Sequence, residues 1–175
     1  MATELIISVV AEDRPGIVDR VSRAVAELHG NWMESRMVRM AGRFAGIIRI
    51  ECAEAERAAL RTGLEALQSE GIRVIIDDEF DGTGDDRSSG IESRRVRLAV
   101  TANDRPGIVQ EVSHCLASLG SNVVQFETDC HSGAMSGQPM FTARIDVDVP
   151  EEIDHTRLVT ALHDLSHDLM VDLEE

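Results

Sequence analysis

A hexapeptide occurs twice in this chain, and its repetition limits what the chain can fold into. Residues Asp13-Arg14-Pro15-Gly16-Ile17-Val18 return as Asp104-Arg105-Pro106-Gly107-Ile108-Val109, 91 residues further on. The same spacing relates five further pairs of identical residues: Val21 and Val112, Ser22 and Ser113, Ala26 and Ala117, Leu28 and Leu119, and Asn31 and Asn122. A chance match of six residues would not extend this far. The chain is therefore a tandem duplication.

Within each copy, the spacing of apolar residues alternates between the period of strands and the period of helices. In the first copy we expect strands at 5–10, 32–40, 44–51 and 72–77, and helices at 17–28 and 60–67. In the second copy we expect strands at 96–100, 123–129, 140–149 and 169–173, and helices at 108–119 and 153–165. The order β-α-β-β-α-β, found twice, predicts an α+β protein of two ferredoxin-like units. Each unit is expected to have an antiparallel sheet with both helices on one face.

Glycine and polar residues predict where these elements end. Gly30 and Gly120 stand where the first helix of each copy should stop. Ala41-Gly42 predicts a tight hairpin, whereas the matching connection of the second copy, 130–139, is expected to be a longer loop. Residues 81–93 are polar and glycine-rich, as in a linker. We therefore expect a first domain at 1–80, a linker at 81–93 and a second domain at 94–175.

Charge and cysteine content limit the classes of function. The formal net charge is −15, and the chain contains no lysine. Such a chain repels the phosphate backbone, which disfavours direct binding of nucleic acid. No apolar run approaches the roughly 20 residues that span a bilayer, and the N-terminus has no secretory pattern. Three cysteines without paired spacing suit a reducing compartment, so we expect a cytoplasmic protein with no membrane contact.

The repeated hexapeptide has the composition of a strand-to-helix turn. Asp13 and Asp104 could cap exposed amides, and Pro15 and Pro106 would suit the first helical turn, where no N–H is needed. The following glycines would leave the backbone bare. Bare amides at a helix N-terminus form a ready site for a carboxylate. The same residues would also make an ordinary helix start without a ligand, and the pattern leaves both interpretations open.

The hexapeptide after a first strand, the asparagine at the start of the second strand and the βαββαβ order together resemble an ACT domain. Further segments resemble the tandem ACT proteins grouped with the glycine cleavage transcriptional repressor: 31–37, 42–45 and 135–141. The resemblance covers nearly the whole chain. It implies a regulatory module that binds an amino acid or similar metabolite between paired domains. Formyltetrahydrofolate deformylases and some phosphoserine phosphatases carry similar modules with an added catalytic domain, for which this chain has no room.

The expected ligand site comprises both turns and the two asparagines: Asp13, Arg14, Pro15, Gly16, Ile17, Val18, Asn31, Asp104, Arg105, Pro106, Gly107, Ile108, Val109 and Asn122. We expect no catalytic residue, no metal and no cofactor. Because the chain is acidic and has no helix-turn-helix pattern, any effect on transcription should pass through a DNA-binding protein partner.

Two other functions stay open from the residues alone. The chain could be an assembly module whose turns hold no ligand. It could also be a small metal- or thiol-dependent enzyme that uses Cys130, or the pair His163 and His167, which stand four residues apart on a predicted helix.

A homodimer is also expected, because the strands carry apolar residues on both alternations. Examples are Ile47 with Ile48, and Val123 with Val124. A sheet with helices on one face needs a cover for its other face if that face is apolar. Either a second chain or the other copy within the chain could provide part of this cover.

The isolated chain is predicted to show no specific DNA binding at physiological salt, because its negative field opposes the approach of a polyanion. Fluorescence anisotropy with labelled duplex DNA in 150 mM salt measures this. Nanomolar operator binding by the isolated chain would contradict it.

Overall fold

The computed structural model describes residues 1–77, 80, 92–133 and 137–174. The chain divides into two compact units, Met1–Ser88 and Ser89–Glu175, and each is described by itself. Most of the predicted linker, 81–93, lies outside the described residues, although its last residue, Ser93, already belongs to a strand. None of the described helices is long and apolar enough to cross a membrane.

The first unit follows the predicted order β-α-β-β-α-β. Its elements are β1 (Ala2–Glu12), α1 (Ile17–Glu27), β2 (Asn31–Met40), β3 (Arg43–Ala53), the 3-10 turn η1 (Glu54–Glu56), α2 (Arg57–Ala66), the 3-10 turn η2 (Leu67–Glu70) and β4 (Ile72–Asp77). Its sheet has the order β2-β3-β1-β4, and all neighbouring strands are antiparallel.

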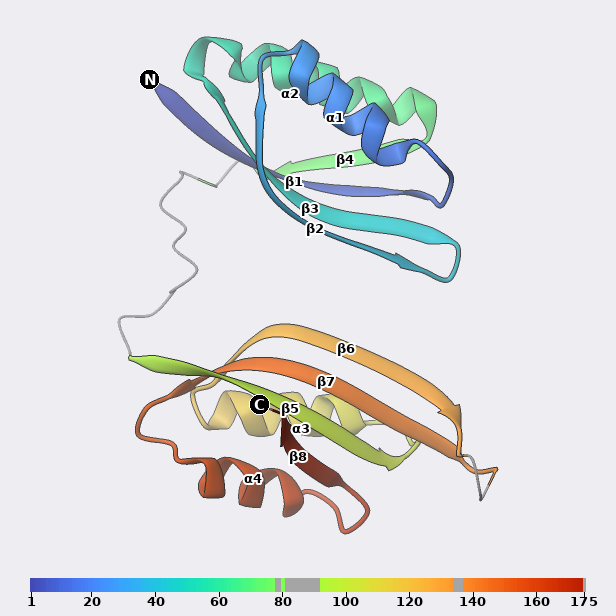
Figure 1. Cartoon of the computed structure of the whole chain (residues 1–175), viewed down its shortest axis with the longest axis vertical. Helices are drawn as coiled ribbons and strands as arrows, with labels where there is room; N and C mark the ends of the chain where they lie inside the picture. The colour runs from blue at the N-terminus through green and yellow to red at the C-terminus, as the bar shows by residue number, and fades with distance from the viewer. Residues whose placement is uncertain (78–79, 81–91, 134–136, 175) are drawn as a thin grey trace. The chain divides into compact units, whose positions relative to one another are not determined.

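The second unit repeats this arrangement. Its elements are β5 (Ser93–Asn103), α3 (Ile108–Ser118), β6 (Asn122–Ser132), β7 (Pro139–Pro150), α4 (His155–His163) and β8 (Met170–Glu174). The sheet order is β6-β7-β5-β8, again antiparallel. In each unit both helices lie on the same face of the sheet (Figure 1). The predicted fold class, two ferredoxin-like βαββαβ units, is confirmed.

Alternation along the strands builds one core in each unit. In β1 the odd positions from Leu5 to Ala11 are buried, and they pack with the buried stripe of α1, which includes Ile17, Val21 and Val25. Successive side chains of a strand point to opposite faces, so the even positions of β1 lie on the face away from the helices. The second unit has the same pattern in β5.

The hairpin predictions are half right. Ala41 and Gly42 both have positive φ, 49° and 73°, which is the backbone of a tight type I′ turn. In the second unit, however, Cys130–Ser132 continue β6 and pair with Pro139–Phe141 of β7. The connection is therefore shorter than the predicted 130–139, because the ladder extends past the residues whose composition indicated a loop. Residues 134–136 of this connection lie outside the described residues.

The predicted helix stop at Gly30 is wrong by one residue, whereas the stop at Gly120 is correct. His29, with φ of 58°, takes the left-handed conformation that Gly120, with φ of 68°, takes in the second unit. Gly30 is needed for packing, because a Cβ there would lie 2.9 Å from Cγ1 of Val25 and 3.1 Å from Cγ2 of Ile50. Its equivalent, Ser121, is buried, and within the described residues its Oγ has no hydrogen-bond partner.

Alanine at these two equivalent positions should change stability in opposite directions. Gly30→Ala crowds a packed core and should lower the free energy of unfolding by about 1–3 kcal/mol. Ser121→Ala removes a buried hydroxyl without a partner and should raise it by about 1 kcal/mol. Urea titration of both variants measures the two effects. Equal signs would contradict the assignment of these positions.

Candidate functional site

Each repeated turn joins the first strand of its unit to the first helix through a left-handed glycine. Gly16 has φ of 91°, and its carbonyl accepts from the Arg20 amide at 2.9 Å, which makes it the N-cap of α1. Gly107 has φ of 97° and accepts from the Glu111 amide at 2.9 Å. L-residues rarely adopt this φ, so the glycines are required by backbone conformation as well as by any need for open space.

Two sequence predictions about this turn are wrong. Pro15 lies in the turn before the helix and not in its first helical turn, because the N-cap is Gly16; the same holds for Pro106 and Gly107. Within the described residues, neither helix start has a side-chain cap hydrogen bond, so Asp13 and Asp104 do not cap.

The two aspartates instead connect each turn to the neighbouring strands. The amide of Asp13 donates to the Gly42 carbonyl at 3.0 Å, and the amide of Asp104 donates to the Pro139 carbonyl at 2.9 Å. The Asp13 carboxylate lies 3.4 Å from Nη1 of Arg39. These bonds fix the turn against the tip of the neighbouring hairpin.

The last two residues of the hexapeptide have different environments. Ile17 and Ile108 are buried in the cores, whereas Val18 and Val109 are 44% and 46% exposed. The isoleucines therefore belong to the cores, whereas the valines lie at the surface beside the turns. An exposed apolar side chain beside uncapped amides adds contact surface for a small molecule.

The asparagines do not join the turns within one unit. Asn31 pairs in register with Glu51, which also faces Glu4 near the start of β1. The turn follows Glu12, eight residues further along β1, or roughly 26 Å at about 3.3 Å per residue. Asn122 has the same placement, since Asp148 faces both it and Arg95.

The first turn is bordered by two guanidinium groups and one carboxylate. Arg14 donates from Nη2 to the backbone carbonyl of Glu70 at 2.6 Å. Arg20 binds the Glu70 carboxylate through Nε at 2.8 Å and Nη2 at 2.6 Å. The hydrogen bond from Arg20 lowers the pKa of Glu70, and the same bond raises the pKa of Arg20. A Cβ placed on Gly16 would meet no atom within 4 Å, so the space above this turn is open.

The second turn has the opposite charge balance. Arg105 binds the Glu111 carboxylate through Nη1 at 2.8 Å and Nη2 at 2.6 Å, which lowers the pKa of Glu111. Asp168 adds a second carboxylate, whose charge interacts with Arg105; a hydrogen bond from Ser166 is the main cause of its lowered pKa. The Glu111 carboxylate also lies 3.5 Å from where a Cβ of Gly107 would be.

Sequence reasoning missed the residues that distinguish the two turns. Arg20 and Glu111 are equivalent positions, because they differ by the repeat spacing of 91. The first turn has a formal charge of +1, from three arginines (14, 20 and 39) and two carboxylates (13 and 70). The second has a formal charge of −2, from Arg105 and three carboxylates (104, 111 and 168). The opposite charges at positions 20 and 111 were visible in the aligned copies and could have indicated this difference.

Comparison with known proteins identifies this architecture. The sequence model of the ACT domain matches residues 3–74. The first unit is therefore similar to an ACT domain over nearly its whole length. The second unit has the same element order, the same sheet order and the same turn, so the chain consists of two ACT-like units. The chain has no match among curated proteins.

Two solved structures resemble the chain over its whole length. One is an unknown protein from Galdieria sulphuraria, with a TM-score of 0.82 and 27% identity, covering 100% of this chain and 99% of that one. The other is described as a "putative glycine cleavage system transcriptional repressor", with a TM-score of 0.71 and 19% identity, covering 99% of this chain and 97% of that one. At this identity the second likeness shows a shared fold.

The other candidate residues do not form a reactive cluster. α4 ends at His163, so His163 and His167 do not share a helix face; Nδ1 of His163 lies 3.1 Å from the Leu169 carbonyl oxygen. Cys130 lies exposed in β6 of the second unit, where partial desolvation and the neighbouring Asp104 raise the pKa of its thiol. Among the described residues, no group of three His, Cys, Asp or Glu side chains could hold a metal ion.

The Arg20–Glu70 pair should make the stability of the first unit sensitive to acid. The pKa of Glu70 lies below its ordinary value of 4.5, so its stabilising effect is complete above pH 4.5 and is lost as pH falls through the lowered value. Glu70→Gln should lower the urea midpoint at pH 7, and the difference from the natural protein should shrink at pH 3. A difference of the same size at both pH values would contradict this.

Proposed function

We propose that this chain is a non-catalytic, cytoplasmic regulatory protein that senses an amino acid or a similar small metabolite through its tandem ACT units and acts through a protein partner. The observation that carries the proposal is the strand-to-helix turn. In both units the N-cap of the first helix is a left-handed glycine, and no side chain caps the helix amides. An arginine and an exposed valine lie beside it. Such a helix start favours a carboxylate, through its amides and the positive end of the helix dipole.

The proposed ligand site comprises Asp13–Val18 in the first unit and Asp104–Val109 in the second. Asn31 and Asn122 lie at the far ends of their own sheets, so they would contribute only if another chain brought them near a turn. The formal charge of +1 and the open space above Gly16 make the first turn the better site for an anion. At the second turn, the carboxylates of Glu111 and Asp168 outnumber the single guanidinium of Arg105 and oppose a ligand carboxylate.

The proposed output is control of transcription, in glycine cleavage or related amino-acid metabolism. It is supported by the full-length likeness to the structure described as a glycine cleavage repressor. With a net charge of −15, the chain would act on DNA through a DNA-binding regulator and not by itself. We propose that it does so as a homodimer.

A thermal-shift screen against the twenty amino acids tests ligand sensing. A ligand present at a hundred times its Kd stabilises the folded state by about 2.7 kcal/mol, which amounts to several degrees in Tm. We expect at least one amino acid to raise Tm by this amount. No shift with any amino acid at 10 mM would overturn the assignment of an amino-acid ligand.

Two matched variants of α1 locate the site. Arg20→Gln removes a guanidinium at the first turn and should weaken binding of the active amino acid at least about tenfold, since a hydrogen bond to a charged group contributes about 1.5–3 kcal/mol. Arg23→Gln removes a guanidinium from the same helix that pairs instead with Asp19, and it should leave affinity unchanged. Calorimetry measures both. Equal affinity in the two variants would place the ligand away from the first turn.

A further inference from the structure

The two units share a fold, but the sheet faces that point away from the helices have opposite chemistry. We call each of these the open face of its unit. In the first unit the open face presents large apolar side chains to solvent: Val10 at 41% exposure, Val38 at 56%, Met40 at 70%, Ile47 at 57% and Ile75 at 58%. All five lie on the same side of the sheet. Val10 alternates with the buried residues of β1, and the strand pairings place the other four on the same side as Val10.

The apolar residues of the first open face are contiguous. Ser8 of β1 pairs with Ile47 on one side and Ile75 on the other. Two residues along, Val10 pairs with Ala45, which pairs in turn with Val38. The centre of the sheet is therefore covered by branched apolar side chains from all four strands. A sheet face that only meets water is normally polar, so this one needs a partner.

At the equivalent positions of the second unit, polar and charged side chains replace the apolar ones. The strand registers align Ile6 with Arg97, Val10 with Thr101, Val38 with Asp129, Met40 with His131, Ile47 with Arg144 and Ile75 with Asp172. The reverse exchange occurs at three positions, where Ala99, Met140 and Met170 stand in place of Ser8, Arg43 and Arg73.

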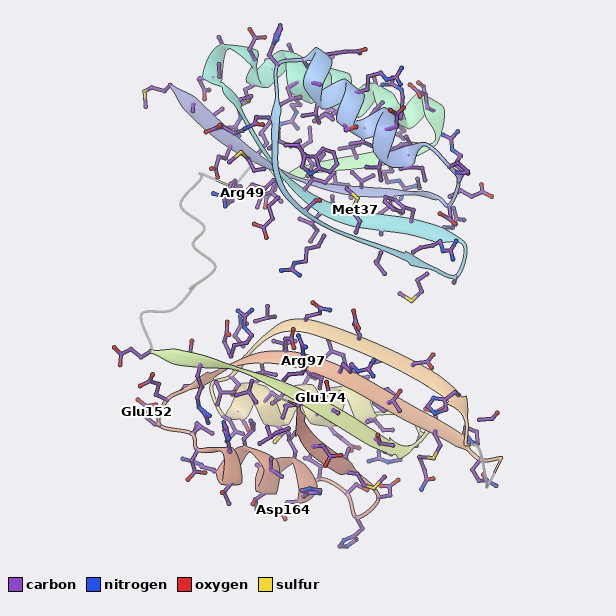
Figure 2. All side chains as sticks on the ribbon, viewed as in Figure 1. Met37, Arg49, Arg97, Glu152, Asp164 and Glu174 are labelled. Carbon is purple, nitrogen blue, oxygen red and sulfur yellow. The ribbon has the colours of Figure 1, made fainter. Side chains whose placement is uncertain are left out.

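Charged residues of the second open face form ion pairs with one another. Arg97 forms two bonds with the Asp146 carboxylate, at 2.6 and 3.0 Å, and Arg95 does the same with Asp148. Arg97 and Glu174, labelled in Figure 2, border a polar hollow of about 290 Å³ on this face. Such a face is suited to water, and it shows that this fold does not require an apolar open face.

We propose that the open face of the first unit is a homodimer interface, which packs face to face against the same face of a second copy of this chain. The assignment rests on the proposed homodimer and is independent of the proposed ligand.

Charge supports a second copy as the occupant. The first open face carries four arginines, 36, 43, 49 and 73, and five carboxylates, 4, 12, 34, 51 and 77, for a net charge of −1. The whole chain carries −15, so two copies repel almost everywhere else. This face is nearly neutral, with positive and negative side chains around an apolar centre, so it favours neither a polycation nor a polyanion as a partner. Two copies of such a face can pair about a two-fold axis with opposite charges in contact.

The size of the face is also sufficient. The four strands have 11, 10, 11 and 6 residues, and each residue covers about 3.3 Å along its strand and about 4.8 Å across it. The resulting plane of roughly 600 Å² reaches the lower end of the roughly 600–1,000 Å² that each partner contributes to a stable interface. Sheets that pack face to face lie about 10 Å apart, with their side chains interdigitated.

The test exchanges the chemistry of the two faces at matched positions. Ile47→Arg introduces the residue that the second unit has at this place, and the two-fold axis would bury two of the new charges. We expect the dimer dissociation constant to rise at least about 100-fold, because the change removes a central apolar contact in each copy and buries two like charges. Val38→Asp, which introduces the second unit's Asp129 in the same way, should have the same effect. Sedimentation equilibrium over 1–200 μM of the full chain measures these constants.

Met170→Arg is the control, because Met170 is 56% exposed on the open face of the second unit, against 57% for Ile47. This variant should dimerise like the natural protein, and all three variants should keep the natural circular dichroism spectrum, which shows that they fold. A natural chain that is monomeric at 200 μM would overturn the proposal, as would a dimer that survives both Ile47→Arg and Val38→Asp. Ligand-induced shifts in Tm, recorded on the same variants, report separately on the proposed ligand site.

Discussion

The pleat of the β-strand is the constraint on which both units depend. Because alternate side chains point to opposite faces, covering one face with two helices fixes every second residue of each strand as core. The buried positions Leu5, Ile7 and Val9 of β1 correspond to Val96, Leu98 and Val100 of β5, all of them apolar. Burying a side chain of this kind contributes about 1.5–3 kcal/mol. Selection for this core leaves the remaining positions of the same strands free to differ.

The order of elements could be predicted from sequence because it depends on local period. Runs such as Leu5 to Val10 and the helical spacing after Ile17 indicate their structure within a few residues, and repetition doubled the evidence. Boundaries were harder to predict. Cys130 and His131 have the composition of a loop, yet pairing with β7 holds them in β6. His163 and His167 have helical spacing, yet α4 ends between them.

The candidate site depended on information that local pattern does not contain. The hexapeptide predicted a turn before a helix correctly, but the roles of its members depend on φ at Gly16, which shifts the N-cap past Asp13 and Pro15. Asn31 seemed close to the turn because both belong to the repeat. Register places it at the other end of β1. Glu70 contacts Arg14 and Arg20 across 56 and 50 residues of sequence, and no periodicity predicts such a contact.

The two copies have diverged in sequence, and two proposed binding properties belong to the first unit. The more cationic turn and the proposed dimer face are both there, and they share β1 and the β2–β3 hairpin: Val10 lies three residues before Asp13, and Met40 lies two residues before Gly42, whose carbonyl holds the Asp13 amide. An anion bound at the turn and a second copy bound on the face would therefore contact the same short backbone segments. Thermodynamic linkage makes the two effects equal. If the ligand changes the dimerisation constant by some factor, dimerisation changes the affinity for the ligand by the same factor. A sensor built this way needs no moving domain. It needs only that the hairpin tip have different preferred positions with and without the anion, so that the population of dimer reports the concentration of ligand.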